Sequence, residues 1–188
     1  MNLLTLTRLL LIGTLATLLS SLSACKPAAG TGGESPPPAN TSVIATGITL
    51  PVIGPAPAWA LTTLDGKPLG SEQLKGKIMV AVFWATWCGP CVHEIPGYIE
   101  MQKKYADRGL VIAGLSVDSQ GAETVSKFYK AKGMNYPVAL ATPEVIAAFG
   151  GIQAIPTTFL IDREGRIRHQ KQGAMDSAEY EKLVLSLF

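Results

Sequence analysis

The sequence predicts an α/β fold in which a central mixed β-sheet is flanked by helices on both faces. Residues 77–85 and 110–117 are continuous apolar runs, which are typical of strands buried on both sides of a sheet. A helical pattern follows each run, and a connection through a helix makes neighbouring strands parallel. Residues 157–171 have the pattern of a β-hairpin, which adds antiparallel strands and makes the sheet mixed.

The first half of the domain is expected to begin with a hairpin. Its expected elements are strands at 58–63 and 67–69, a helical turn at 71–74, a strand at 77–85, a helix at 91–107 and a strand at 110–117. The pair Asp65-Gly66 is typical of a tight turn between two strands. Gly109 follows the long helical pattern, and glycine is the residue that most often ends a helix.

The second half is expected to alternate short elements. These are a helix at 123–132, a strand at 138–141, a helix at 143–149, paired strands at 157–161 and 167–171, and a helix at 177–187. Gly133 closes the first helix, which is amphipathic. Pro143 suits the first turn of a helix, where a missing N–H costs little.

Composition and charge exclude several classes of protein. The chain of 188 residues has 16 basic and 14 acidic side chains, a balance that does not suggest a nucleic-acid partner. Hydrophobic residues make up 47% of the chain, which excludes wholesale disorder. The three cysteines are too few for a disulfide framework, since Cys25 stands alone while Cys88 and Cys91 lie close together.

The N-terminal residues differ from the domain in composition. Residues 1–24 contain ten leucines and one charged side chain, Arg8, and their apolar stretch is shorter than a membrane span, which is typical of a signal peptide. Residues 25–46 are rich in proline and glycine, so we expect an extended, flexible tether. Residues 47–188 then form one domain.

The tetrapeptide Leu22-Ser23-Ala24-Cys25 resembles the cleavage box of bacterial lipoproteins. The resemblance implies that Cys25 becomes the acylated first residue of the mature chain and anchors it to the lipid bilayer. Two or three acyl chains hold a protein stably at a membrane, whereas a single chain binds reversibly. The alternative is an uncleaved signal anchor with an incidental cysteine.

Cys88 and Cys91 are the expected chemical centre. Two residues between them place both on one helical turn, where their sulfurs can reach bonding distance. Cys88 at the helix start would face unpaired N–H groups, which lower the pKa of its thiol and favour the thiolate. We therefore expect thiol–disulfide exchange, in which Cys88 attacks a substrate disulfide and the more buried Cys91 resolves the mixed disulfide.

Two other interpretations of these cysteines stay open. Cys88, Cys91 and His93 offer two thiolates and an imidazole, a set that a non-enzymatic metal-delivery protein could use. A structural zinc site usually has a fourth ligand and a second ligand pair, neither of which follows in the sequence, so no metal is expected. The cysteines could also be inert structural residues.

The segment Phe83-Trp84-Ala85-Thr86-Trp87-Cys88-Gly89-Pro90-Cys91 resembles the active site of the thioredoxin superfamily. Ile155-Pro156-Thr157-Thr158 resembles the cis-proline loop that lies opposite the dithiol in that superfamily. Glu94, Pro96, the N-terminal hairpin and the helical insert after Val117 resemble its TlpA/ResA-like branch. The similarity spans residues 53–188.

This resemblance implies a thioredoxin-like fold and a membrane-anchored, extracytoplasmic thiol–disulfide oxidoreductase, on the periplasmic side in a Gram-negative cell. Such proteins often reduce protein disulfides, and the haem-site cysteines of apocytochrome c are one known substrate class. It further implies a monomer with no cofactor besides its redox-active disulfide, and a membrane electron donor that reduces it again.

The resemblance also implies roles for single residues. Cys88 becomes the nucleophile, Cys91 the resolving thiol, and Glu94 a carboxylate that exchanges protons with Cys91. The alternative for Glu94 is a solvated helix residue. Pro156 is expected to be cis. The substrate-binding residues implied are Trp87, Gly89, Pro90, Ile155 and Pro156.

One position departs from the family's pattern. Thioredoxin has a buried aspartate six residues before the nucleophile, where this sequence has Val82, so more weight falls on Glu94. A peroxiredoxin-like peroxidase is the other enzymatic alternative, because residues 115–118 and the insert resemble that relative. Ala81 and Ala85 stand where its PxxxTxxC pattern has proline and threonine, so the pattern fails.

Overall fold

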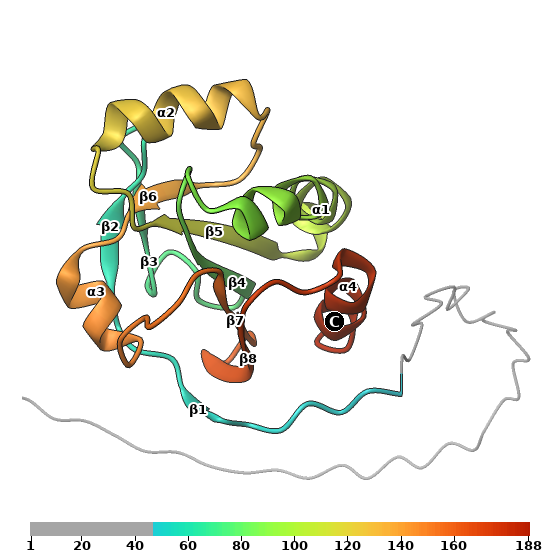
Figure 1. The fold of residues 1–188 in the computed structure, drawn as a ribbon. Helices are drawn as coiled ribbons and strands as arrows, with labels where there is room; N and C mark the ends of the chain where they lie inside the picture. The colour runs from blue at the N-terminus through green and yellow to red at the C-terminus, as the bar shows by residue number, and fades with distance from the viewer. Residues whose placement is uncertain (1–46) are drawn as a thin grey trace, which may run out of the picture. The chain divides into compact units, whose positions relative to one another are not determined.

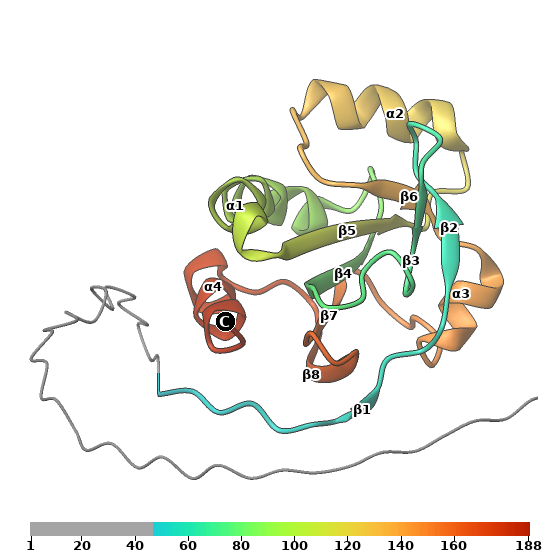
Figure 2. The same cartoon turned by 180° about the vertical axis from the view of Figure 1, so that it is seen from behind.

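The computed structural model describes residues 47–188; the predicted signal peptide, Cys25 and the tether lie outside the described residues. Its strands are β1 (Gly54–Pro55), β2 (Ala60–Thr62), β3 (Pro68–Gly70), β4 (Ile78–Trp84), β5 (Leu110–Ser116), β6 (Val138–Leu140), β7 (Thr157–Ile161) and β8 (Arg166–Gln172). Its helices are α1 (Gly89–Tyr105), a 3₁₀ turn (Ala106–Arg108), α2 (Ala122–Ala131), α3 (Pro143–Ala148) and α4 (Ser177–Leu185). Figures 1 and 2 show their arrangement from opposite sides.

The main sheet has six strands in the order β1-β8-β7-β4-β5-β6. β4 is parallel to β5 and antiparallel to β7, so the predicted mixed sheet is confirmed. The hairpin β2–β3 forms a separate two-stranded sheet, joined to β6 by a single bridge between Thr63 and Ala139.

β4 is the centre of the core because every residue in it is buried. Its side chains alternate between the two faces of the sheet, as a strand requires. Val80, Val82 and Trp84 pack in the cluster that also holds residues of α1, α2 and α4. Ala81 and Phe83 pack in the opposite cluster, beneath the β2–β3 hairpin and α3. A strand buried on both faces holds its carboxyl end, and the loop that follows it, in a fixed place.

The expected helices and strands are present, with small differences at their ends. α1 begins at Gly89 and not at residue 91, because Cys88 caps it with its side chain. The prediction of a helical turn at 71–74 is wrong, since these residues form hydrogen-bonded turns without a helix.

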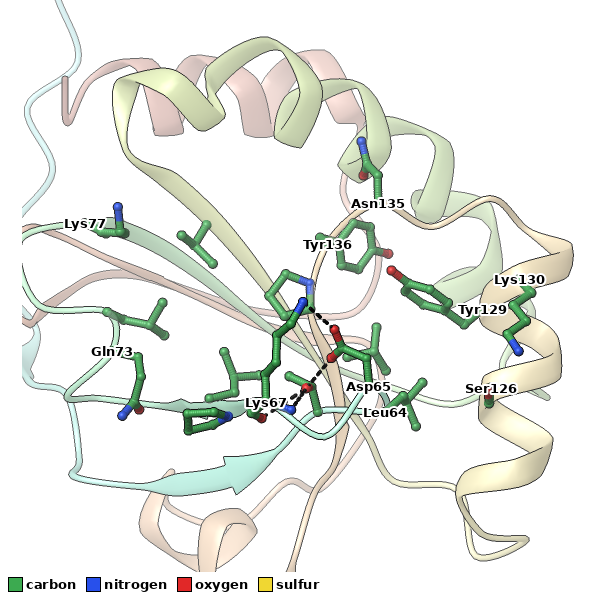
Figure 3. A pocket seen from close by; sticks show the side chains of 17 residues that line it. Leu64, Asp65, Lys67, Gln73, Lys77, Ser126, Tyr129, Lys130, Asn135 and Tyr136 are labelled. Carbon is green, nitrogen blue, oxygen red and sulfur yellow. Dashed lines mark hydrogen bonds and ion pairs between the residues drawn. The ribbon is translucent and has the colours of Figure 1, made fainter.

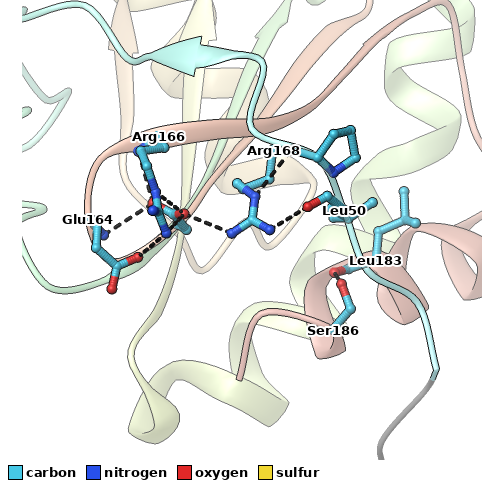
Figure 4. A network of polar contacts seen from close by, with 8 residues as sticks. Leu50, Glu164, Arg166, Arg168, Leu183 and Ser186 are labelled. Atoms are coloured by element: carbon cyan, nitrogen blue, oxygen red, sulfur yellow. Dashed lines mark hydrogen bonds and ion pairs between the residues drawn. The ribbon is translucent and has the colours of Figure 1, made fainter.

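β1 was not expected, because two residues of the type Gly-Pro give no strand signal. The residues just before β1 are held by Arg168 of β8, a side chain distant in sequence (Figure 4). The guanidinium of Arg168 donates hydrogen bonds to the carbonyl oxygens of Leu50 and Pro51, and its third bond goes to Asp162 at 3.0 Å. Long-range contacts therefore place β1 beside β8.

The helices α1 and α4 approach each other closely at Gly97. A Cβ atom added at Gly97 would lie 2.1 Å from Oγ and 2.7 Å from Cβ of Ser177. Only a glycine fits there. The close contact allows the residues just before α4 to lie against the first half of α1.

We predict that Gly97→Ala destabilises the domain by about 1–3 kcal/mol, because overpacking outweighs the better helix propensity of alanine. Urea unfolding measures the change. Gly54→Ala is the control, since a Cβ there meets nothing within 4 Å. The additional change Ser177→Gly should restore most of the loss; if the double variant is as unstable as Gly97→Ala, the close contact is not its cause.

Candidate active site

Cys88 and Cys91 are joined by a disulfide at the amino end of α1, with their Cα atoms 5.3 Å apart. Cys88 is the N-cap of the helix and has an extended backbone conformation. Its sulfur accepts a hydrogen bond from the backbone N–H of Cys91 at 3.2 Å. In the reduced protein the same N–H would face a thiolate, which is the form that attacks disulfides.

Both cysteines are buried, and Cys88 is slightly more exposed than Cys91. Cys91 is 2% exposed and Cys88 is 6% exposed, so Cys88 lies just beneath the surface. Its neighbours form the rim: Trp87 is 65% exposed, and Gly89 and Pro90 are exposed. A partner that reaches Cys88 must therefore contact these residues.

The loop before β7 lies against the dithiol, although it is far away in the sequence. The Ile155–Pro156 peptide bond is cis, as the resemblance implies. The carbonyl oxygen of Ile155 is 3.8 Å from the sulfur of Cys88. The carbonyl of Pro156 accepts the N–H of Gly173, whereas Ile155 has no backbone hydrogen bond to another described residue. Ile155 therefore offers free backbone groups beside the reactive sulfur.

Glu94 is buried, which contradicts the alternative of a solvated helix residue. It lies one turn after Cys91 on α1 and is 6% exposed. One carboxylate oxygen accepts the N–H of Met175 at 2.8 Å, and the other, also buried, has no hydrogen-bond partner among the described residues. Burial raises the pKa of Glu94 above its usual range, although the hydrogen bond from Met175 and the nearby hydroxyl of Tyr98 oppose this.

Two tyrosines that sequence reasoning missed surround this carboxyl group. Tyr98, Tyr180 and Glu94 line one small space between α1 and α4. The hydroxyl of Tyr98 lies 3.5 Å from Oγ1 of Thr158, and the hydroxyl of Tyr180 is buried without a partner among the described residues. Tyr98 follows Glu94 by one helical turn, a spacing that could have indicated the contact, whereas nothing local marks Tyr180.

The remaining candidates lie apart. Val82 is buried in the core, so an apolar side chain occupies the position where thioredoxin has its aspartate. His93 is exposed on α1. Within residues 47–188, no three His, Cys, Asp or Glu side chains are grouped so that they could share a metal ion. Nor is any helix in this range long and apolar enough to cross a membrane.

A cavity of about 680 Å³ lies between the β2–β3 hairpin, the β5–β6 edge and α2 (Figure 3). Tyr129 and Tyr136 line it together with Lys67, Lys77 and Lys130. The Lys67 ammonium is 2.7 Å from the carboxylate of Asp65 at the same cavity. None of the residues expected at the active site lines this space. The dithiol therefore stands outside it.

Comparisons with known proteins agree with this geometry. The model of the AhpC/TSA family matches residues 52–170. Thiol-disulfide oxidoreductase ResA of Bacillus thuringiensis (strain Al Hakam) is 35% identical over 126 residues, which cover 67% of this chain and 72% of the relative. The protein of the same name from Bacillus subtilis (strain 168) is 34% identical, with 69% and 73% covered.

A solved structure is similar in both sequence and fold. The thiol:disulfide interchange protein of the thioredoxin family from Chlorobium tepidum TLS superposes with a TM-score of 0.67 at 40% identity. The match covers 71% of this chain and 94% of that protein. Since sequence, fold and the paired cysteines agree, the chain belongs to the AhpC/TSA family of thioredoxin-fold proteins and is a thiol–disulfide oxidoreductase.

Proposed function

We propose that this protein reduces disulfides of other proteins at the extracytoplasmic face of a membrane, with Cys88 as nucleophile and Cys91 as resolving thiol. The observation that carries the proposal is the hydrogen bond from the N–H of Cys91 to the sulfur of Cys88, at the start of α1. A donor in this position stabilises a thiolate more than a thiol.

The exchange proceeds in two steps. In the reduced enzyme, the Cys88 thiolate attacks one sulfur of a substrate disulfide; a mixed disulfide forms and the other substrate sulfur leaves as a thiolate. Cys91 then loses its proton and attacks the sulfur of Cys88. The second substrate thiolate leaves, and the Cys88–Cys91 disulfide remains. Two electrons have passed to the substrate, so a membrane electron donor with a dithiol must reduce the enzyme again. The dithiol is the only redox group in this scheme, which needs no further cofactor.

Glu94 is proposed as the base for Cys91. A carboxylate with an ordinary pKa is a weak base toward a thiol, whose pKa is about 8.5. Burial of Glu94 raises its pKa and narrows this difference. Its second oxygen is buried and free of hydrogen bonds within the described residues, so it is available for a proton.

The substrate is proposed to bind across the rim of the dithiol. Trp87, Gly89 and Pro90 supply an exposed surface on one side of Cys88. On the other side lies Ile155, whose backbone groups have no backbone hydrogen bond to another residue in the range 47–188, next to the buried Pro156. An extended peptide that pairs with Ile155 would bring its own disulfide over Cys88.

The anchor and the substrate are proposed from sequence resemblance. Acylated Cys25 would hold the monomer at the bilayer while residues 26–46 give the domain reach. Apocytochrome c, whose haem-site cysteines form a disulfide, is the proposed substrate class. Capture of apocytochrome c from membranes by the Cys91→Ser variant tests this choice.

Replacing each cysteine separately should separate the two steps. Cys88→Ser is expected to abolish reduction of a protein disulfide, because the attacking sulfur is gone. Cys91→Ser should retain the first step and accumulate mixed disulfides, which non-reducing gels detect. A Cys91→Ser protein that traps no partner would contradict the mechanism. Hydrogen peroxide serves as the control substrate, and neither the unchanged protein nor a variant should consume it.

Glu94→Gln should slow the resolving step by about 10-fold or more, since general base catalysis is lost. Because burial raises the pKa of Glu94, its carboxylate form disappears as pH falls through a range above the ordinary one for glutamate. The rate of the unchanged enzyme should therefore fall on the acidic side, and Glu94→Gln should lose this dependence. Stopped-flow measurement of mixed-disulfide decay against pH gives both results.

The matched control for this substitution is Glu100→Gln, on the exposed side of α1. It should leave the rate and its pH profile unchanged. If Glu94→Gln also has the profile of the unchanged enzyme, Glu94 does not transfer the proton.

Cys25→Ser should abolish incorporation of labelled palmitate and leave the leader uncleaved, because the residue that is acylated at the cleavage site is lost. Cys88→Ser should incorporate palmitate and be processed normally, and it serves as the control. If the unchanged protein incorporates no palmitate, residues 1–24 act as a signal anchor.

A further inference from the structure

The loop between β4 and α1 is held by one carboxylate, that of Asp118. Thr86, two residues before Cys88, donates its backbone N–H to one oxygen of Asp118 at 2.9 Å. The hydroxyl of Thr86 donates to the other oxygen at 2.6 Å. Both carboxylate oxygens therefore bind the residue that begins the turn toward the dithiol.

Asp118 is itself held by hydrogen bonds to Ser116, the last residue of β5. The hydroxyl of Ser116 donates to the carboxylate at 2.8 Å and accepts the N–H of Asp118 at 3.1 Å. Ser116 is fully buried and Asp118 is 8% exposed. The N–H of Val117 donates to the carbonyl of Trp84 at 2.9 Å, which extends the β4–β5 pairing to this point. The carboxylate thus lies at the end of the paired, buried strands β4 and β5.

The turn that Asp118 holds determines where the reactive sulfur lies. The N–H of Cys88 donates to the carbonyl of Ala85 at 3.2 Å, so residues 85–88 form one closed turn with Thr86 inside it. The sulfur of Cys88 must meet the N–H of Cys91 on one side and Ile155 on the other. A change in the position of Thr86 would move Cys88 relative to both.

We propose that Asp118 is a positioning residue for thiol–disulfide exchange, which acts through Thr86 to hold the sulfur of Cys88 against the amino end of α1. The inference rests on the proposed role of Cys88 as the nucleophile. It gives a function to the segment 115–118, which the sequence only relates to peroxiredoxins. Asp118 contacts neither the substrate nor the sulfurs in this proposal.

The test measures the reactivity of Cys88 directly, by its rate of alkylation with iodoacetamide as a function of pH in the Cys91→Ser background. Asp118→Ala should lower the rate near neutral pH by about 10-fold, since a misplaced sulfur loses its N–H donor, and should raise the apparent pKa of Cys88. Asp118→Asn keeps an oxygen that can accept the N–H of Thr86 and removes a negative charge. It should restore the rate to within about threefold, with an apparent pKa no higher than that of the parent.

Two further variants separate positioning from general loss of stability. Thr86→Val keeps the size of the side chain but loses the hydroxyl donor, and should have an intermediate effect. Asp162→Ala is the matched control, because Asp162 is 4% exposed and binds Arg166 and Arg168 at the far end of β7 from Pro156. It should lower the unfolding midpoint and leave the alkylation profile of Cys88 unchanged.

Three outcomes would overturn the inference: Asp118→Ala folds with the parent's alkylation profile, Asp118→Asn is as slow as Asp118→Ala, or Asp162→Ala slows alkylation equally. Failure of the proposed function would give a different result from failure of this inference. The parent would then show a reactive Cys88, dependent on Asp118, but the protein with both cysteines would not reduce a protein disulfide.

Discussion

The chemistry proposed for this protein depends on one hydrogen bond, from the backbone N–H of Cys91 to the sulfur of Cys88. It exists only if α1 begins at Gly89, since the N–H groups of a first helical turn have no partner within the helix. The helix can begin there because β4, which is buried on both faces of the sheet, ends at Trp84. The buried strand fixes the position of the loop that leads to α1. The buried sheet therefore fixes the position of the Cys88 sulfur beneath its exposed rim.

One turn after Cys91 on α1, the buried carboxyl group of Glu94 lowers stability at neutral pH, a cost that its proposed role in proton transfer would explain. Its pKa is raised in the folded protein, so the folded state binds its proton more tightly than the unfolded state does. Folding stability therefore falls as pH rises from the ordinary pKa of glutamate through the raised value, and the loss persists above it. A glutamine or an apolar residue would avoid this cost. Carboxyl groups with a shifted pKa cluster at functional sites, and Val82 leaves the position used by thioredoxin without a carboxyl group.

The sequence predicts the parts of this structure that local patterns determine. β4 and β5 are apolar runs, the cysteine pair has helical spacing, and Pro143 and Gly109 mark helix ends. The rest depends on contacts between distant residues. β1 exists beside β8 because Arg168 reaches the backbone of Leu50, and no pattern near either residue indicates it. Glu94 is buried because α4 and the residues just before it pack against α1, with a close contact at Gly97. Without α4, the same position on α1 would be solvated.

The two buried carboxylates differ in their hydrogen bonds, and this difference fits their proposed roles. Both oxygens of Asp118 accept bonds, from Thr86 and Ser116, so the group is suited to hold a loop. Glu94 has one oxygen bound by Met175 and one buried oxygen without a partner among the described residues. A buried acceptor left open is costly in a protein interior. An open acceptor one helical turn after Cys91 fits the proposed transfer of a proton from the thiol of that residue to Glu94.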